Sequence, residues 1–161
     1  MIIPLACYSS PTPQTEDPVT CTNGSIVSKP VGQQDNGPDM LPGSSCNVCH
    51  KLLPGHELTI SGTVYPTSHE PDNCKGEAKP TYTIEVTDSK GVKATIPVND
   101  GGNQNGNFFF TGALTPPYKA LVRSSTGAVR VMPFEVPIGD CNNCHTQFGA
   151  GGAPGRIKTP K

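Results

Sequence analysis

The pattern Cys-x-x-Cys-His occurs twice in this chain, at residues 46–50 and 141–145, and it constrains the molecule more than any other feature. The pattern is typical of the covalent attachment of c-type haem. Two thiols three positions apart reach the two vinyl groups of one porphyrin, and the adjoining histidine then lies under the iron as its axial ligand. We therefore expect two covalently bound haems. The thioether cysteines are Cys46, Cys49, Cys141 and Cys144, and the proximal histidines are His50 and His145.

Zinc binding and dithiol redox chemistry are the alternatives for paired Cys-x-x-Cys motifs. In zinc sites the two pairs usually lie ~15–20 residues apart, whereas here residues 51–140 separate them. Zinc would also leave the repeated histidine unexplained. A thioredoxin-like pair needs a βαβ context, and the sequence shows none. Haem attachment is therefore favoured.

The other two histidines, His56 and His69, match the number of axial positions that remain on two irons. Four histidines fill two bis-histidine haems. The alternative is that one of these histidines is merely solvated and that Met40 or Met132 supplies a thioether, which would raise the potential. His56 follows His50 by six residues and would have to pass the porphyrin edge to reach the same iron. The pairing of distal histidines with irons stays open.

Three cysteines lie outside the motifs, namely Cys7, Cys21 and Cys74. Haem is attached to such chains outside the cytoplasmic membrane, so we expect an exported protein, periplasmic, outer-surface or extracellular, in which disulfides persist. A Cys21–Cys74 disulfide is the preferred pairing, and Cys7 with either of them is the alternative. Residues 3–7 resemble the end of a bacterial lipoprotein signal but lack a basic region and a full apolar region. Cys7 is thus a candidate for lipidation or for an intermolecular link.

Composition limits the size of the core and the classes of partner. The chain of 161 residues has 18 glycines, 18 prolines and no tryptophan, which indicates a small core with long irregular segments. A net charge of -1 gives no basic surface for nucleic acid. No apolar run approaches the ~18–20 residues that cross a bilayer, so membrane association is expected only through a lipid anchor.

Hydrophobic residues alternate with polar residues from Glu57 to Val131, in runs of strand length. The runs are separated by turn sequences at residues 88–91 and 124–127, and they predict about six short strands of a mainly β fold, a small sandwich of the immunoglobulin-like kind. We divide the chain into four segments. They are an extended arm rich in proline and glycine (1–45), the first haem-binding segment (46–56), the β-sandwich (57–135), and the second haem-binding segment with an irregular tail (136–161).

The middle of the chain resembles the carboxypeptidase-regulatory or transthyretin-like β-sandwich. The resemblance rests on residues 60–65 (ISGTVY), 86–91 (VTDSKG) and 106–110 (GNFFF). It implies a structural or adhesive module and carries over no catalytic residue. The two flanking motifs resemble those of multihaem c-type cytochromes. Together the resemblances imply a small dihaem cytochrome with a sandwich between its haem-binding segments.

These expectations favour electron transfer over catalysis. Bis-histidine ligation fills both axial positions, so iron cannot bind a substrate without losing a ligand. The alternative is a dihaem peroxidase, or a redox or gas sensor, with one open iron. We expect redox partner proteins or extracellular electron acceptors. Head-to-tail association into a conductive filament, with an arm or a distal histidine donated to the next copy, competes with a monomer tethered through Cys7.

The C-terminal segment 146–161 is expected to be a solvated tail. A second hypothesis places its cations beside haem propionates, where they would offset the propionate charge. The cations concerned are Arg156, Lys158 and Lys161.

Overall fold

The computed structural model describes residue 22 and residues 41–79, 81–99 and 105–161. Within these residues the fold is mainly β, with two sheets and the single α-helix α1 (Cys46–His50). The first sheet has the order β4-β1-β7, and the second has the order β3-β2-β5-β6. The strands are β1 (Ile60–Tyr65), β2 (Tyr82–Thr87), β3 (Lys93–Pro97), β4 (Asn107–Phe110), β5 (Lys119–Ser124), β6 (Val129–Val131) and β7 (Ile157–Lys158).

The two sheets enclose one apolar core, as the alternating sequence predicts. In the second sheet all neighbouring strands are antiparallel, and inward side chains pair across strands, such as Ile84 with Ile96 and with Val122. In the first sheet β1 runs antiparallel to β4 and parallel to β7. All six predicted runs form strands, so the mainly β prediction is confirmed. The buried core side chains are Ile60, Val64, Ile84, Val86, Ala94, Ile96, Val98, Phe108, Tyr118 and Val122.

The turn between β2 and β3 is fixed by the buried carboxylate of Asp88. That carboxylate accepts the backbone N–H groups of Lys90 and Val92, each at 2.8 Å, and of Thr115 at 2.9 Å. Gly91 has a φ of 82°, which favours glycine. The turn predicted at residues 88–91 is therefore confirmed.

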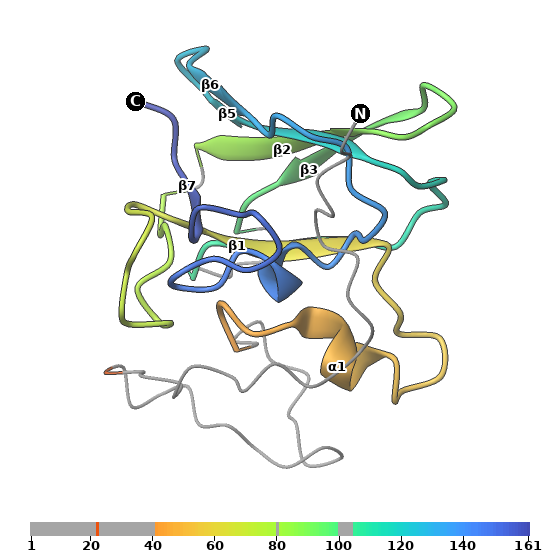
Figure 1. Cartoon of the computed structure of the whole chain (residues 1–161), viewed down its shortest axis with the longest axis horizontal. Coiled ribbons are helices and arrows are strands. Elements are labelled where there is room, and N and C mark those ends of the chain that lie inside the picture. The colour runs from red at the N-terminus through yellow and green to blue at the C-terminus, as the bar shows by residue number, and fades with distance from the viewer. Residues whose placement is uncertain (1–21, 23–40, 80, 100–104) are drawn as a thin grey trace.

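Strand β1 is buried on both faces, unlike the other strands of the described chain. One face packs into the core, and the other is covered by the segments that carry the two Cys-x-x-Cys-His motifs. Figure 1 shows α1 and the short 3-10 helix η2 (Cys141–Asn143) on the side of β1 away from β2. On the core face of β1, Gly62 leaves room for Phe108 and for Cys141 of the second motif, because a Cβ there would lie 2.7 Å from Phe108 Cζ and 3.1 Å from Cys141 Cβ. The sheet thus holds both motifs against one strand.

The C-terminal segment is packed, which differs from the expected solvated tail. Strand β7 pairs with β1, and Arg156 is only 4% exposed. Its guanidinium lies 4.5 Å from the centre of the Tyr65 ring and donates to the Glu70 carbonyl and to Asn73 Oδ1, at 3.2 and 2.6 Å. Arg156 is thus committed to the fold, and the hypothesis that it serves a haem propionate is withdrawn. The sequence did not predict β7 because it has only two residues.

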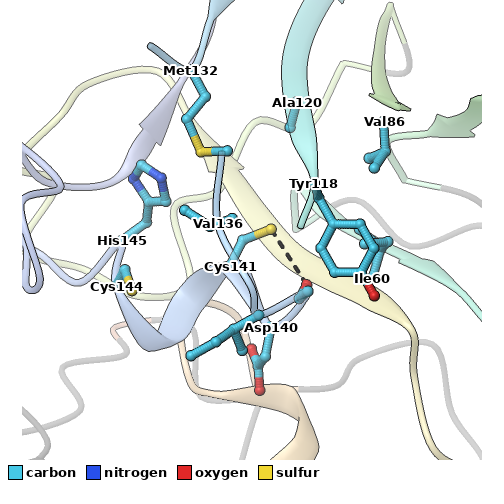
Figure 2. Close-up of a pocket in the computed structure, with 12 residues that line it drawn as sticks. Ile60, Val86, Tyr118, Ala120, Met132, Val136, Asp140, Cys141, Cys144 and His145 are labelled. Atoms are coloured by element: carbon cyan, nitrogen blue, oxygen red, sulfur yellow. Dashed lines mark hydrogen bonds between the residues drawn. The ribbon is translucent and has the colours of Figure 1, made fainter. Parts of the chain in front are cut away.

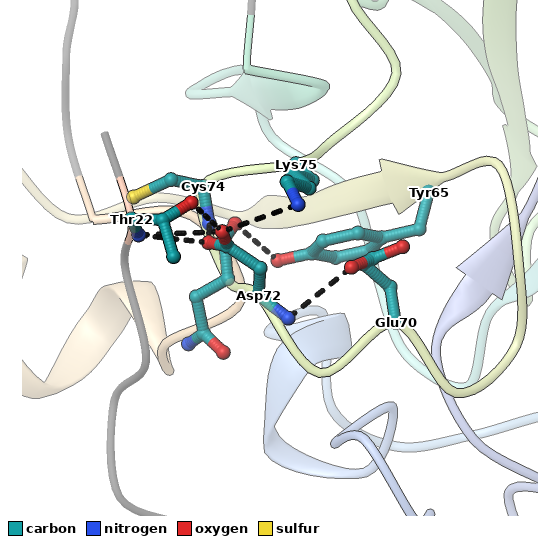
Figure 3. Close-up of polar contacts among 7 residues, drawn as sticks. Thr22, Tyr65, Glu70, Asp72, Cys74 and Lys75 are labelled. Atoms are coloured by element: carbon teal, nitrogen blue, oxygen red, sulfur yellow. Dashed lines mark hydrogen bonds and ion pairs between the residues drawn. The ribbon is translucent and has the colours of Figure 1, made fainter.

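A polar cluster beside Tyr65 orders the loop that contains Cys74 (Figure 3). The carboxylate of Asp72 accepts the backbone N–H of Cys74 at 2.9 Å and the hydroxyl of Thr22, and Lys75 Nζ lies 3.9 Å from it. Burial alone would raise the pKa of Asp72, but these donors outweigh it and lower the pKa. The rest of the expected arm, residues 1–21 and 23–40, lies outside the described residues, as do Cys7, Cys21 and Met40.

Candidate haem site

The structure brings the two motifs side by side, although they lie 95 positions apart in the chain. The contact is made by Asp140, the residue before the second motif. Its carboxylate accepts the Ser45 hydroxyl at 2.7 Å and the backbone N–H groups of Asn47 at 2.8 Å and Cys46 at 3.3 Å. Ser45 occupies the N-cap position of α1 but makes no side-chain cap bond. Asp140 therefore satisfies the first donors of the helix that carries the first motif.

A second buried side chain, Asn142, joins the same segments from inside the second motif. Its Nδ2 donates to the Ser44 carbonyl at 2.9 Å and to Thr63 Oγ1 at 3.0 Å, and its Oδ1 accepts the Thr63 backbone N–H at 3.0 Å. Asn142 is 2% exposed. One of the two variable positions of this motif is thus required by the fold. Sequence reasoning had given no role to Asp140 or Asn142, because their partners are distant in the chain.

Both proximal histidines have a ring nitrogen bound to a backbone carbonyl. His50 Nδ1 lies 2.9 Å from the His56 carbonyl oxygen, and His145 Nδ1 lies 2.8 Å from the Gly155 carbonyl oxygen. A carbonyl can only accept, so Nδ1 carries the proton. This arrangement fixes the ring orientation and leaves Nε2 as the atom for ligation, which is the usual support for a metal-bound histidine. Burial lowers the pKa of His145, which favours the neutral form that binds metal.

The two histidines expected as distal ligands are both exposed. His69 Nδ1 donates to the Gln147 carbonyl at 2.8 Å, and its ring stacks with that of Phe148 at a centroid distance of 6.4 Å. His69 therefore lies beside the segment that follows the second motif. His56 lies beside the first motif, since His50 binds its carbonyl oxygen.

An apolar pocket opens beside the second motif, between that motif and the sheets (Figure 2). Cys141, Cys144 and His145 lie on one side of it, and Met132, which follows β6, contributes its thioether side chain. No residue of the first motif lines this pocket. The apolar side chains of its wall are Ile60, Val86, Ala120, Val136 and Ile138.

Burial suppresses ionisation of two motif thiols. Desolvation first, and the charge of Asp140 second, raise the pKa of Cys46 and of Cys141 from 9.0 to about 12. The thiolate is the reactive form of cysteine. In the folded chain these two sulfurs therefore stay protonated and unreactive across the physiological range.

This predicts slow alkylation of Cys46 and Cys141 in folded full-length chain produced without haem. A rise of three pKa units lowers the thiolate population at pH 8 by about a thousandfold, because the thiol stays protonated until the pH nears 12. Iodoacetamide labelling followed by peptide mass spectrometry measures the rate at each cysteine. The same chain in denaturant is the control, and equal rates at these two sites in both conditions would contradict the prediction.

Cys74 and Cys144 are disulfide-bonded, whereas Cys46, Cys49 and Cys141 are free thiols. Cys21, the expected partner of Cys74, lies outside the described residues. A sulfur in a disulfide cannot also form a thioether. Haem attachment at the second motif therefore requires Cys144 in its reduced form.

The described residues contain neither a direct metal-binding cluster nor a membrane-spanning helix. No group of three or more His, Cys, Asp or Glu side chains there is arranged to hold a metal ion directly. Within residues 22, 41–79, 81–99 and 105–161, no helix has the length and apolar character that a membrane crossing requires. Comparison of the chain with protein families, curated proteins and solved structures finds no match.

Proposed function

We propose that this chain is an exported dihaem c-type cytochrome that transfers electrons. Each motif attaches one haem through its two cysteines, and His50 and His145 bind the two irons from one side. The haems supply the redox chemistry, and the protein supplies attachment, axial ligands and the surroundings of each iron. No catalytic residue is assigned, because electron transfer needs none.

The observation that carries this proposal is the packing of both Cys-x-x-Cys-His motifs against one strand. Asp140 and Asn142 join the segments through hydrogen bonds of 2.7–3.3 Å. Asn142 also binds Thr63 of β1, and Cys46 lies beside Ser61 of the same strand. Two distant copies of a haem-attachment motif gain from such adjacency, because electrons must pass between the cofactors. A sandwich of the transthyretin-like kind would be the scaffold that brings them together.

Exposed apolar side chains beside the motifs also support a bound porphyrin. Val48 lies within the first motif and is 59% exposed, Leu52 follows it and is 61% exposed, and Phe148 follows the second motif and is 69% exposed. These three exposed side chains lie in or beside the two motifs, where an attached porphyrin would cover them. The lining of the pocket beside Cys141 and His145 is apolar as well, which is the character that the wall of a haem site has.

The bond from His50 to the His56 carbonyl limits how His56 can act as a ligand. It holds the His56 backbone at the Nδ1 side of the His50 ring, whereas iron binds at Nε2. A second histidine ligand to an iron held by His50 would have to come from a residue that is not held at the Nδ1 side of the His50 ring. We therefore assign His56 to an iron other than the one bound by His50. We propose a second copy of the chain as the recipient, in agreement with head-to-tail assembly.

For the iron bound by His145 there are two candidate sixth ligands. His69 lies beside the segment after the second motif, and Met132 lines the pocket that contains His145. We propose His69 as the sixth ligand, because it completes bis-histidine ligation. Met132 is the alternative, because its side chain lines the pocket beside His145. A thioether ligand would give the higher potential of the two.

Carbon monoxide binding to the reduced protein tests electron transfer against catalysis. If both irons are six-coordinate, we expect no change in the visible spectrum on exposure to carbon monoxide, since no axial position is open. The spectrum is recorded at concentrations where the protein is assembled and after dilution. A stoichiometric spectral change in assembled protein would instead identify an open iron, as in a dihaem peroxidase or a gas sensor.

A further inference from the structure

The carboxylate of Asp140 is an electrostatic element that both proposed haem sites share. It is bonded to the first motif through Ser45, Cys46 and Asn47, and it directly precedes Cys141 of the second. The side chain is 5% exposed. The same carboxylate therefore lies beside the first thioether position of each motif.

The surroundings of this carboxylate do not neutralise it. Its partners are one hydroxyl and two backbone N–H groups, and no lysine, arginine or histidine of the described residues forms an ion pair with it. A buried charge acts strongly on neighbouring groups, because little solvent screens it. Asp140 already contributes to the raised pKa of both the Cys46 and the Cys141 thiols. Its field thus reaches both attachment points.

We propose that Asp140 is a positioning residue that lowers the reduction potential of both haems and holds their attachment segments in fixed register. The inference rests on the proposed function. Reduction of a haem removes one positive charge from the iron, so a nearby negative charge favours the oxidised form. Because this one carboxylate lies beside both attachment segments, we expect its removal to change the reduction potentials of both haems.

The test is a redox titration of Asp140→Asn in the mature protein. Asparagine retains an acceptor for α1 but has no charge, and Ser45→Lys is a second variant that offsets the charge without removing the carboxylate. We expect each variant to favour reduction of both haems by about tenfold, which is about 59 mV for a one-electron couple. Asp140→Glu keeps the charge and is expected to restore potentials close to those of the wild type.

Asp88→Asn is the matched control. Asp88 is also buried, at 7% exposure, and also accepts backbone N–H groups, but its partners lie in the turn after β2 and at Thr115. We expect it to shift either potential by less than about threefold. This inference would be overturned if both potentials were unchanged in Asp140→Asn and Ser45→Lys, or if only one haem shifted. Either result would leave the proposed function intact. A wild-type protein without haem would overturn the proposed function itself.

Discussion

Replacing Cys46 and Cys49 together by alanine is expected to reduce the covalent haem content from two per chain to one. Each motif attaches its porphyrin through its own two thioethers, so the change removes one attachment and leaves the other chemically intact. The Cys141→Ala and Cys144→Ala pair is expected to remove the other haem, and all four substitutions to remove both. Intact mass under denaturing conditions counts only covalently held haem.

Cys74→Ser is the control for loss of cysteine as such. Cys74 is disulfide-bonded and lies outside both motifs, so its removal should cost stability, about 2–5 kcal/mol, and leave two haems in place. Retention of two covalent haems in the Cys46 and Cys49 double variant would show that the first motif does not attach haem.

Asn142→Ala is expected to lower the free energy of unfolding by about 2–4 kcal/mol. Alanine cannot replace the three hydrogen bonds to Ser44 and Thr63, and it leaves the buried backbone N–H of Thr63 and the half-buried carbonyl of Ser44 without the Asn142 side chain as a partner. Urea unfolding of the mature protein, followed by circular dichroism, measures the change. The cysteines and histidines of the motif are untouched, so covalent haem should remain.

The neighbouring residue offers a matched comparison within the same motif. Asn143 is half-buried, and its side chain has no hydrogen-bond partner among the described residues, so Asn143→Ala is expected to change the unfolding free energy by no more than about 0.5 kcal/mol. Equal effects at the two positions would mean that the Asn142 hydrogen bonds do not hold the motifs together.

Local patterns in the sequence were enough to predict strands β1 to β6. Alternation placed Ile84 and Val86 in β2 and Ala94 and Ile96 in β3, and the turn residues from Asp88 to Gly91 marked the hairpin between them. Such features act over a few residues, so they can be read without knowing the fold. The same holds for the Cys-x-x-Cys-His motifs, whose spacing alone suggests the cofactor.

The contacts that join the motifs could not be predicted in this way. An aspartate before a helix is expected to cap that helix, yet Asp140 caps α1, 94 positions away from the capped Cys46. Arg156 looked like a solvated cation because its partners, Tyr65 and Asn73, are supplied by a distant strand and loop. In each case tertiary packing decided the role of the residue.

Covalent haem stoichiometry of the mature wild-type chain tests the central claim most directly. The pyridine haemochrome spectrum gives the haem concentration, and denaturing intact mass gives the number of haems on each polypeptide. We expect two per chain by both methods. A mature chain with the mass of the polypeptide alone, and no haem absorbance, would contradict the assignment of both motifs.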